Sequence, residues 1–515
     1  MKCLPSAKLP QAQGSVLHDW HAEVLAIRAF NRFVLEECRQ LALGGPDTSS
    51  PFLRRRTPEE VRASAPTAGS YGDAEGGCWH AQPFAWRDDV ALHMYCSEAP
   101  CGDASMELTM AAQADAAPWD IPSIPSSPFP RPSSPFPSNS ATPAEAEPTA
   151  LPGRAYFSLL GAVRRKPARG DAPPTLSKSC SDKLALRQCA SLLSGLAALL
   201  VSPESAYVRN LVLPEAAYSA GGCRRAFSAA TAPDEEEKGN GDGDGDDEGG
   251  SGAEVREAKA RAGEGRMRPL CGRKWGGGYA FRPFEVRTTG LEFAFSRREV
   301  SRRSAKTAAS NLAVAWTAAP TSLPIPISPL PTSPTSTPPP SAPTLLTSPP
   351  PASTLHSHPQ AGPRPTLTSN PLSTGYPSTT NSPTSPIRAP MGLEEATLGG
   401  TLQGRKQFDA RGASFATRRR MWGLAAEVAD LLAVANNTGV AGRAEAGEGV
   451  AGMVGEGAEE EAGVVEIQRT LVGARTYGEL KECDLLAARR RVKDEVKAEA
   501  LKGWVRNLGD EGFGL

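Results

Sequence analysis

The fold of this chain is decided by the stretch His18-Asp19-Trp20-His21-Ala22-Glu23-Val24-Leu25-Ala26-Ile27-Arg28. Within it, His21 and Glu23 are separated by one residue. An imidazole at the first position can hold Zn²⁺, while a carboxylate two residues later can move protons without being a ligand. From Ala22 to Leu41, helix-forming residues place apolar side chains at near-helical spacing. The pair is therefore expected to open a helix. Further helices are expected in the Ala/Leu-rich segment from Asp182 to Val201 and, at the end of the chain, from Tyr477 to Lys502.

A second motif supplies a thiolate. Pro100-Cys101-Gly102-Asp103 follows a predicted buried strand, and an H-x-E pair followed by Pro-Cys is the signature of zinc deaminases that act on bases. The second cysteine of that signature would stand at Ala104, so the third ligand is expected at Cys180, in Ser179-Cys180-Ser181-Asp182-Lys183. A helix predicted to open at Cys101 would favour its thiolate form.

These three motifs, in this order, resemble the RNA adenosine deaminases. The similarity is closest to the tRNA-specific, fungal-type branch, which converts the adenosine 3′ of the anticodon of alanine tRNA to inosine. The resemblance implies an α/β fold, with a cytidine-deaminase-like mixed sheet flanked by helices and a C-terminal helical extension. It also implies that His21, Cys101 and Cys180 hold a catalytic zinc. Glu23 would be the proton shuttle, and Asp19 would orient the residues around the metal.

Three protein ligands and one water make the open coordination that a catalytic zinc requires. The metal lowers the pKa of its water to about 7, which makes hydroxide available to attack C6 of adenine. Glu23 would carry the proton to N1 and then to the leaving amine. Two alternatives remain. One is a deaminase of free nucleosides, disfavoured by the chain length and the remote third ligand. The other is a non-catalytic or inactive truncated RNA-binding homologue.

The resemblance further implies a buried inositol hexakisphosphate, which related editing enzymes hold with basic and aromatic side chains. Matching residue types are Arg28, Lys183, Arg418, Tyr477, Lys481, Arg491 and Trp504. A polyanion can satisfy many buried cations that would otherwise be costly. Ile27, Leu186 and Ala487 depart from the pattern of the editing enzymes. The alternative is an exposed basic C-terminal helix with a solvated face.

Two basic groups are candidates for contacts with RNA phosphates. Residues 405–420 hold six Arg or Lys against one acid, and a second group precedes Cys180. The second group consists of Arg164, Arg165, Lys166 and Arg169. No RNA-recognition motif or double-stranded-RNA-binding domain is found ahead of the motifs, which favours a compact substrate such as tRNA.

Composition indicates one deaminase domain, spanning 1–515, that is interrupted by inserts. Gly and Pro make up about 19% of the 515 residues, against an average near 12%. Segments of this kind cannot bury enough apolar surface to offset the entropy of ordering. The predicted disordered inserts are 43–75, 113–150, 230–266, 318–390 and 438–463. Because a helix and a strand are expected before the first ligand, Met1 is predicted to be an internal methionine of a longer chain.

Cysteine usage points to a reducing compartment. Ten cysteines stand at irregular spacing, so those outside the metal site are expected to be free thiols. The net charge of −1 combines an acidic insert with basic segments elsewhere and does not identify a partner. The apolar run from Leu192 to Val201 is too short to cross a bilayer. We therefore expect a cytoplasmic or nuclear protein with no membrane role.

Overall fold

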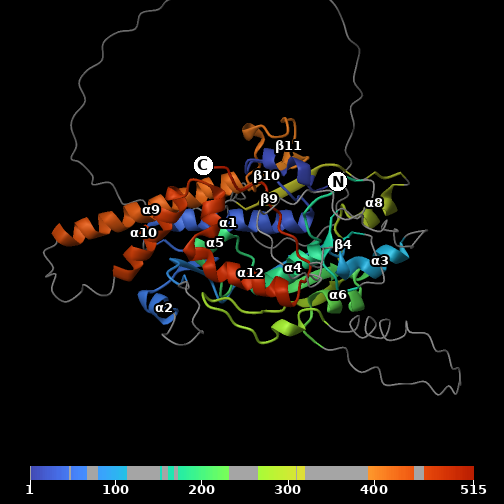
Figure 1. The fold of residues 1–515 in the computed structure, drawn as a ribbon, viewed down its shortest axis with the longest axis horizontal. Coiled ribbons are helices and arrows are strands. Elements are labelled where there is room, and N and C mark those ends of the chain that lie inside the picture. The colour runs from blue at the N-terminus through green and yellow to red at the C-terminus, as the bar shows by residue number, and fades with distance from the viewer. Residues whose placement is uncertain are drawn as a thin grey trace, which may run out of the picture. The chain divides into compact units, whose positions relative to one another are not determined.

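The structure is a computed structural model that describes residues 2–45, 48–65, 79–112, 151–153, 160–166, 172–230, 265–304, 306–308, 310–318, 392–445 and 458–515. For residues 436–445 and 458–461 the structure describes the backbone but not the side chains. The predicted inserts 113–150, 230–266 and 318–390 lie wholly or mostly outside the described residues. The described part is a mixed α/β arrangement, as predicted (Figure 1).

The stretch that begins at His21 forms helix α1 (Ala22–Gly44), with His21 as its N-cap residue. The prediction of a helix opening at the His-x-Glu pair is confirmed. One face of α1 buries Val34 and Leu35 completely. Figure 1 shows α1 running beside α9 (Arg418–Glu445), with which it packs. Apolar residues that precede α1, from Leu4 to Trp20, form a second buried cluster with the first turns of α1, with Ala313 and Ala315, and with Phe415 and Ala416 just before α9.

The described strands form four small sheets. Parallel strands β3 (Leu92–Tyr95), β7 (Val208–Pro214) and β8 (Glu285–Thr289) form the sheet next to the candidate site. A second sheet contains β1 (Leu53–Arg55), β2 (Phe84–Trp86) and β6 (Val201–Ser202). A third contains β9 (Ala313–Thr317), β10 (Leu393–Leu398) and β11 (Thr401–Leu402), and the fourth pairs β4 (Leu151–Pro152) with β5 (Arg164–Arg165). β2 pairs antiparallel with β1 and parallel with β6, so this sheet is mixed.

The Ala/Leu-rich segment after Cys180 was predicted as one helix from Asp182 to Val201. The structure instead has α4 (Cys180–Ala190) and α5 (Gly195–Leu200). Ser191, at φ 55°, ends the first helix, and the Ser194 side chain caps the second. By length and hydropathy, Cys180–Leu200 is the one described stretch able to cross a membrane, but 72% of it is buried inside the protein, which is usual for core helices.

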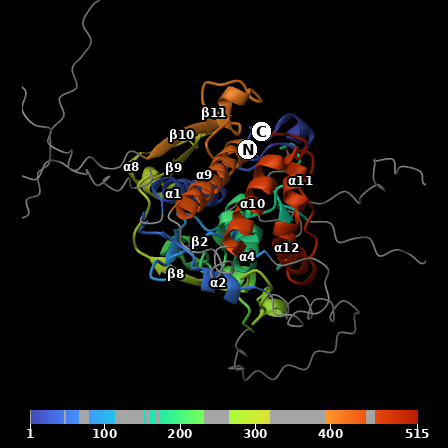
Figure 2. The same ribbon diagram turned by 90° about the vertical axis from the view of Figure 1, so that its left-hand side faces the viewer.

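The C-terminal helix predicted from Tyr477 to Lys502 is also broken in two. α11 (Tyr477–Glu482) ends at Cys483, and α12 (Ala487–Glu499) starts after a short 3₁₀ turn. α10 (Ala458–Gly473) packs along α9, and Figure 2 shows α10, α11 and α12 near one another. The break turns α12 back toward α4, with which it packs.

Two stretches predicted to be disordered contain regular structure. Within 43–75, β1 is followed by α2 (Pro58–Ala63), which is closed by a capping box between Thr57 and Glu60. A Pro in the first turn and a Thr three residues before a Glu are the standard signal for a helix start. The prediction of disorder considered only the composition of this segment and therefore missed that signal. Helices α9 and α10 extend into 438–463 from both sides. The remaining helices are α3 (Met106–Ala111), α6 (Ala220–Phe227) and α8 (Arg297–Arg303).

Candidate metal centre

The imidazole of His21 is held in a fixed orientation at the start of α1. Its Nδ1 lies 2.8 Å from Asp19 Oδ1, and its backbone N–H donates to the same oxygen at 3.1 Å. A carboxylate on one ring nitrogen directs the other toward a ligand and fixes the tautomer. Nε2 is thus the atom available to a metal. Glu23 follows in the first turn of α1, half-buried.

Cys101 and Cys180 adjoin each other. Cys101 precedes a 3₁₀ turn that leads into α3, and Cys180 is the first residue of α4, behind the N-cap Ser179. The backbone N–H of Cys180 donates to Cys101 Sγ at 3.4 Å. A hydrogen bond from the Cys180 thiol, helped by the Lys166 cation, lowers the pKa of Cys101 to about 6. Cys101 is therefore a thiolate at neutral pH, the form that binds metal.

The four predicted residues lie within electrostatic reach of one another. Both His21 and Glu23 are close enough to perturb the Cys101 thiolate electrostatically, and Glu23 also acts on Cys180. The helix predicted to open at Cys101 does not do so, because a 3₁₀ turn (Asp103–Ser105) comes first and α3 starts only at Met106. The fold thus brings segments that lie about 80 residues apart in the sequence near the start of α1.

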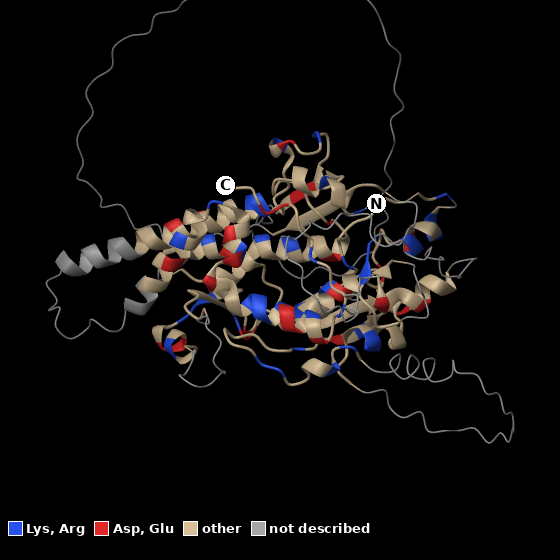
Figure 3. Ribbon diagram, in the orientation of Figure 1, with Lys and Arg blue, Asp and Glu red and all other residues tan. Residues whose placement is uncertain are grey.

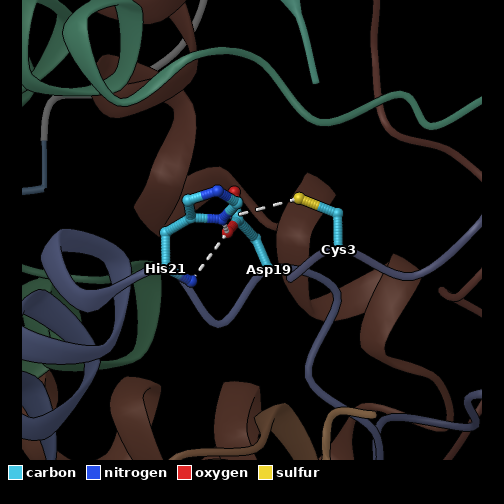
Figure 4. Close-up of side chains that lie close together, drawn as sticks. All are labelled: Cys3, Asp19 and His21. Atoms are coloured by element: carbon cyan, nitrogen blue, oxygen red, sulfur yellow. Dashed lines mark hydrogen bonds and ion pairs between the residues drawn. The ribbon is translucent and has the colours of Figure 1, made fainter. Parts of the chain in front are cut away.

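Within the described parts of the chain, one set of donor atoms lies within 4.8 Å of one another: those of Cys3, Asp19 and His21 (Figure 4). Cys3 Sγ is 3.7 Å from His21 Nδ1. Burial, followed by the Asp19 charge, raises the pKa of Cys3 to about 12, so Cys3 is a thiol at neutral pH. Asp19 already holds Nδ1. The described donor atoms of His21, Cys101 and Cys180 do not all lie that close to one another, so their joint role as zinc ligands stays a prediction, with Nε2 as the atom that His21 would use.

Lys166 was not predicted to belong to this site. Its Nζ donates to Asp19 Oδ2 at 2.9 Å and to Cys180 Sγ at 3.1 Å. Lys166 and Arg164 were predicted to contact RNA, but both are buried, so that prediction is wrong for them. Arg165 is half-buried, and Arg169 lies outside the described residues. The sequence shows a basic group and carries no signal that one of its members turns inward.

The Asp19 carboxylate contacts His21 and both lysines of the site, in keeping with the orienting role that the resemblance implied. Its second oxygen accepts from Lys166, Lys183 and, at 2.6 Å, the hydroxyl of Ser177. Burial alone would raise the pKa of Asp19, but Lys183 and Lys166 hold it well below its ordinary value. Asp19 is consequently ionised and able to fix the Nδ1–H tautomer of His21.

Comparison with known proteins agrees with this constellation. Residues 77–238 match the adenosine-deaminase (editase) domain family. The resemblance to the RNA adenosine deaminases is confirmed. The chain is 37% identical over 204 residues to tRNA-specific adenosine deaminase 1 of Schizosaccharomyces pombe, covering 39% of this chain and 40% of that protein. It is 30% identical over 215 residues to tRNA-specific adenosine deaminase 1 of Saccharomyces cerevisiae, covering 42% and 44%. The chain thus aligns with about two fifths of the length of these relatives.

The two cysteine loops of the editase segment are locked by buried carboxylate–arginine pairs. Asp103, two residues after Cys101, accepts from Arg225 at 3.1 Å. Asp182, two residues after Cys180, pairs with Arg266 at 2.6 Å. All four side chains are at most 5% exposed. Each cysteine is thereby placed by a charge pair that the protein interior strengthens.

We expect Arg225→Met to lower the free energy of unfolding by about 3–5 kcal/mol, because removing one partner leaves the Asp103 carboxylate buried without its counter-charge. Chemical denaturation measures the loss. Arg224→Met is the matched control, since Arg224 is the exposed neighbour on α6. Equal free energies of unfolding for the two variants would contradict the structural role of the pair.

A cavity of about 720 Å³ lies on the other side of Asp19 and Lys183. Its lining includes eleven basic and four acidic residues. Six of the seven predicted anion-binding residues line it: Arg28, Lys183, Arg418, Tyr477, Lys481 and Trp504. The prediction was wrong for Arg491, which is 56% exposed and pairs with Glu495 at 2.9 Å. The lining residues that the sequence analysis missed include Lys178, Arg187, Arg489, Arg490, Lys493 and Lys497.

The basic residues that line this cavity outnumber the acidic residues that could neutralise them. Burial, followed by repulsion from Arg489 and Arg187, holds the pKa of Lys493 well below its ordinary value. Burial and then Arg489 lower the pKa of Arg187 to about 9, and burial and then Arg418 lower that of Arg28 to about 10. Cations that depress one another's pKa in an enclosed space form a site suited to a multiply charged anion.

Proposed function

We propose that this chain is a zinc-dependent hydrolase that deaminates adenosine to inosine in tRNA. The observation that carries the proposal is the contact between the Cys101 thiolate and the Cys180 thiol, with His21 and Glu23 within electrostatic reach of it. Three protein ligands would leave the fourth coordination position of a zinc to a water. The matching editase family and the names of the two yeast relatives support adenosine as the reacting base and tRNA as its carrier.

The residues of the chain have distinct tasks in this reaction. A bound zinc would supply a water whose pKa is lowered to about 7. Asp19 holds His21 in the tautomer that presents Nε2 to the metal. Lys166 contacts both Asp19 and Cys180, and would balance the charge of Asp19 and of the thiolate that Cys180 becomes as a metal ligand. Glu23, in the first turn of α1, would take one proton of the attacking water and deliver it to N1 of the adenine. It would then transfer the second proton of that water, from the hydroxyl on C6, to the amine, which leaves as ammonia.

The finer features of the proposal follow the resemblance. The target is the adenosine 3′ of the anticodon in alanine tRNA. The sheet is of the cytidine-deaminase type, supported by the parallel strands β3, β7 and β8 and by α4, which carries the third ligand. The location is cytoplasmic or nuclear, supported by nine described cysteines that are free thiols.

Deamination of free nucleosides is the competing function. Incubating the purified chain with tRNA or with adenosine, and measuring inosine by mass spectrometry, separates the two. We expect inosine in tRNA and none from free adenosine, because the base must be presented by a structured RNA and flipped into the site. Inosine from free adenosine alone would favour the nucleoside enzyme. An intact, zinc-loaded chain without either product would favour the inactive RNA-binding homologue.

The basic cavity is proposed to hold inositol hexakisphosphate. Its support is the excess of cations over acids in the lining and the mutual depression of their pKa values. Lys183 lines the cavity and also pairs with Asp19, which holds His21. The anion would therefore contact Lys183 from the side away from the metal centre. It would keep Lys183 charged in the series of contacts from Lys183 through Asp19 to His21.

Lys493→Met tests the cavity. Removing the half-buried Lys493, whose charged form burial and the neighbouring cations disfavour, is expected to leave the anion-free protein at least as stable as the wild type. The same change should reduce the stabilisation that added inositol hexakisphosphate gives. Thermal unfolding with and without the anion measures both effects. Lys502→Met, on an exposed residue after α12, is the control. A destabilised anion-free Lys493→Met protein with unchanged response to the anion would contradict the proposal.

A further inference from the structure

Helix α8 and the loop before it form an exposed basic and aromatic surface. The side chains of Leu291, Phe293 and Phe295 are 77%, 49% and 76% exposed. The two phenylalanine rings face each other edge to face, with centroids 5.7 Å apart. Large aromatic side chains in open solvent are unusual in a folded protein and point to a binding surface.

The helix beside these rings is strongly basic. Residues 297–306 contain four arginines and one lysine against a single acid, Glu299. Glu299 accepts from both Arg302 and Arg303, so one carboxylate serves two guanidinium groups. Arg297 is also exposed. Figure 3 shows Lys and Arg colouring on α8, at the place where Figure 1 labels it.

This surface is anchored beside the candidate metal centre. Arg298 donates to the carbonyl of Ser97 at 2.8 Å and pairs with Glu98 at 3.1 Å. The hydroxyl of Tyr95 donates to the carbonyl of Leu291 at 3.1 Å. The chain from Ser97 reaches Cys101 in four residues, which span at most about 14 Å when fully extended. The surface therefore lies within a few nucleotides of the reacting base.

We propose that Phe293, Phe295, Arg297, Arg302 and Arg303, the α8 surface, bind the RNA strand next to the flipped adenosine. The inference rests on the proposed function and adds to it the place where the substrate is held. Flipping a base leaves its neighbours unstacked, and aromatic side chains can stack on them whatever their sequence. The arginines contact the adjoining phosphates, for which guanidinium groups are suited by charge and geometry.

An acidic protein partner is the other class of macromolecule with matching charge. RNA is favoured because the two exposed rings carry no polar group and stand next to cations. Stacking platforms flanked by arginine are the usual surface for single-stranded nucleic acid. The position beside the Cys101 loop also requires that an RNA substrate pass over or near α8.

Fluorescence anisotropy of labelled tRNA with the full chain, between about 50 and 200 mM salt, tests the proposal. Arg302→Ala with Arg303→Ala should raise the Kd and reduce the salt slope by about 2, because each arginine removed leaves one phosphate unneutralised. Arg297→Ala should reduce the slope by about 1 without disturbing the last turn of α8. Arg475→Ala is the control, on a residue 87% exposed that pairs with Glu479 in α11.

Variants of Phe295 distinguish stacking from apolar docking. Phe295→Leu should weaken tRNA binding about 5- to 150-fold, the range measured for loss of one stacked base, whereas Phe295→Trp should keep the wild-type Kd. Leu508→Ala, on a residue 58% exposed, is the apolar control. Thermal unfolding confirms that each variant is folded.

The outcomes separate this inference from the proposed function. If wild-type protein forms inosine in tRNA but the arginine variants and Phe295→Leu keep its Kd and salt slope, the α8 surface does not bind RNA and the proposed function stands. If the Kd for tRNA weakens in Phe295→Ala but not in Phe295→Leu, the ring makes an apolar contact rather than a stacked one, which would overturn the stacking role. If wild-type protein forms no inosine, the proposed function fails on its own.

Discussion

Glu23→Gln is expected to abolish inosine formation while zinc stays bound. Glutamine keeps the size and polarity of the side chain in the first turn of α1 but cannot carry a proton. General acid–base catalysis contributes about 10²–10⁴-fold to a rate, so the rate constant at saturating tRNA should fall by at least that factor. The tRNA affinity should change little, because Glu23 acts on the reacting atoms and not on the phosphates.

Single-turnover assays with tRNA measure this loss, and metal analysis of the same sample shows whether zinc is retained. Glu36→Gln is the matched control on the same helix, where Glu36 pairs with Arg32 at the i, i+4 position. It should keep the wild-type rate. A Glu23→Gln protein that retains more than about a tenth of the wild-type rate would remove Glu23 from the mechanism.

Serine at Cys101 or at Cys180 is expected to remove the zinc and with it all inosine formation. Serine replaces a soft thiolate by a hydroxyl that stays protonated at neutral pH, and ligands must be deprotonated to bind the metal. Metal analysis of the purified variants should fall from about one zinc per chain to near none. The effect should equal that of prolonged chelation of the wild-type protein.

Two further cysteine variants sharpen this test. Cys271→Ser is the control for an exposed thiol. Cys3→Ser asks whether the cluster of Cys3, Asp19 and His21 (Figure 4) is the true metal site. We expect both variants to keep zinc, because the pKa of Cys3 is raised to about 12 and its thiol is protonated. Zinc lost from Cys3→Ser but kept in Cys101→Ser and Cys180→Ser would move the metal site to that cluster.

The candidate metal centre could be proposed from the sequence because its residues lie in short motifs with a chemical meaning. His21 and Glu23 are two residues apart at the start of a helix whose apolar spacing is plain. Cys101 and Cys180 each precede an Asp that a buried arginine then fixes. The arginines themselves, Arg225 and Arg266, are remote in sequence and carry no motif, so only the fold reveals them.

The lining of the anion cavity shows why matching to the editing enzymes by residue type assigned Arg491 wrongly. Arg490, Lys493 and Lys497 recur at i, i+3 and i+7 on α12 and therefore share one face, the face that lines the cavity. Arg491 lies one step round the helix and points to solvent. Helical periodicity applied to α12 would have separated these side chains, whereas matching by residue type did not. Lys166 is a different case, because nothing local distinguishes it from its neighbours.

The helix breaks were missed because they depend on backbone conformations that propensity does not reveal. The segment after Cys180 is rich in Ala and Leu throughout, yet Ser191 takes a left-handed conformation and ends α4. Arg187 donates to the carbonyls of Ser191 and Leu193 in this turn, and Arg489 donates to that of Leu193 from α12. Contacts from a distant helix thus help to set where the helix ends.

The measurement that tests the central claim most directly is the inosine content of alanine tRNA after incubation with the purified, zinc-loaded chain. We predict inosine at the position 3′ of the anticodon, its formation lost after chelation and restored by zinc. A folded, zinc-loaded chain that leaves every adenosine of the tRNA unchanged, under conditions in which it binds that tRNA, would contradict the account.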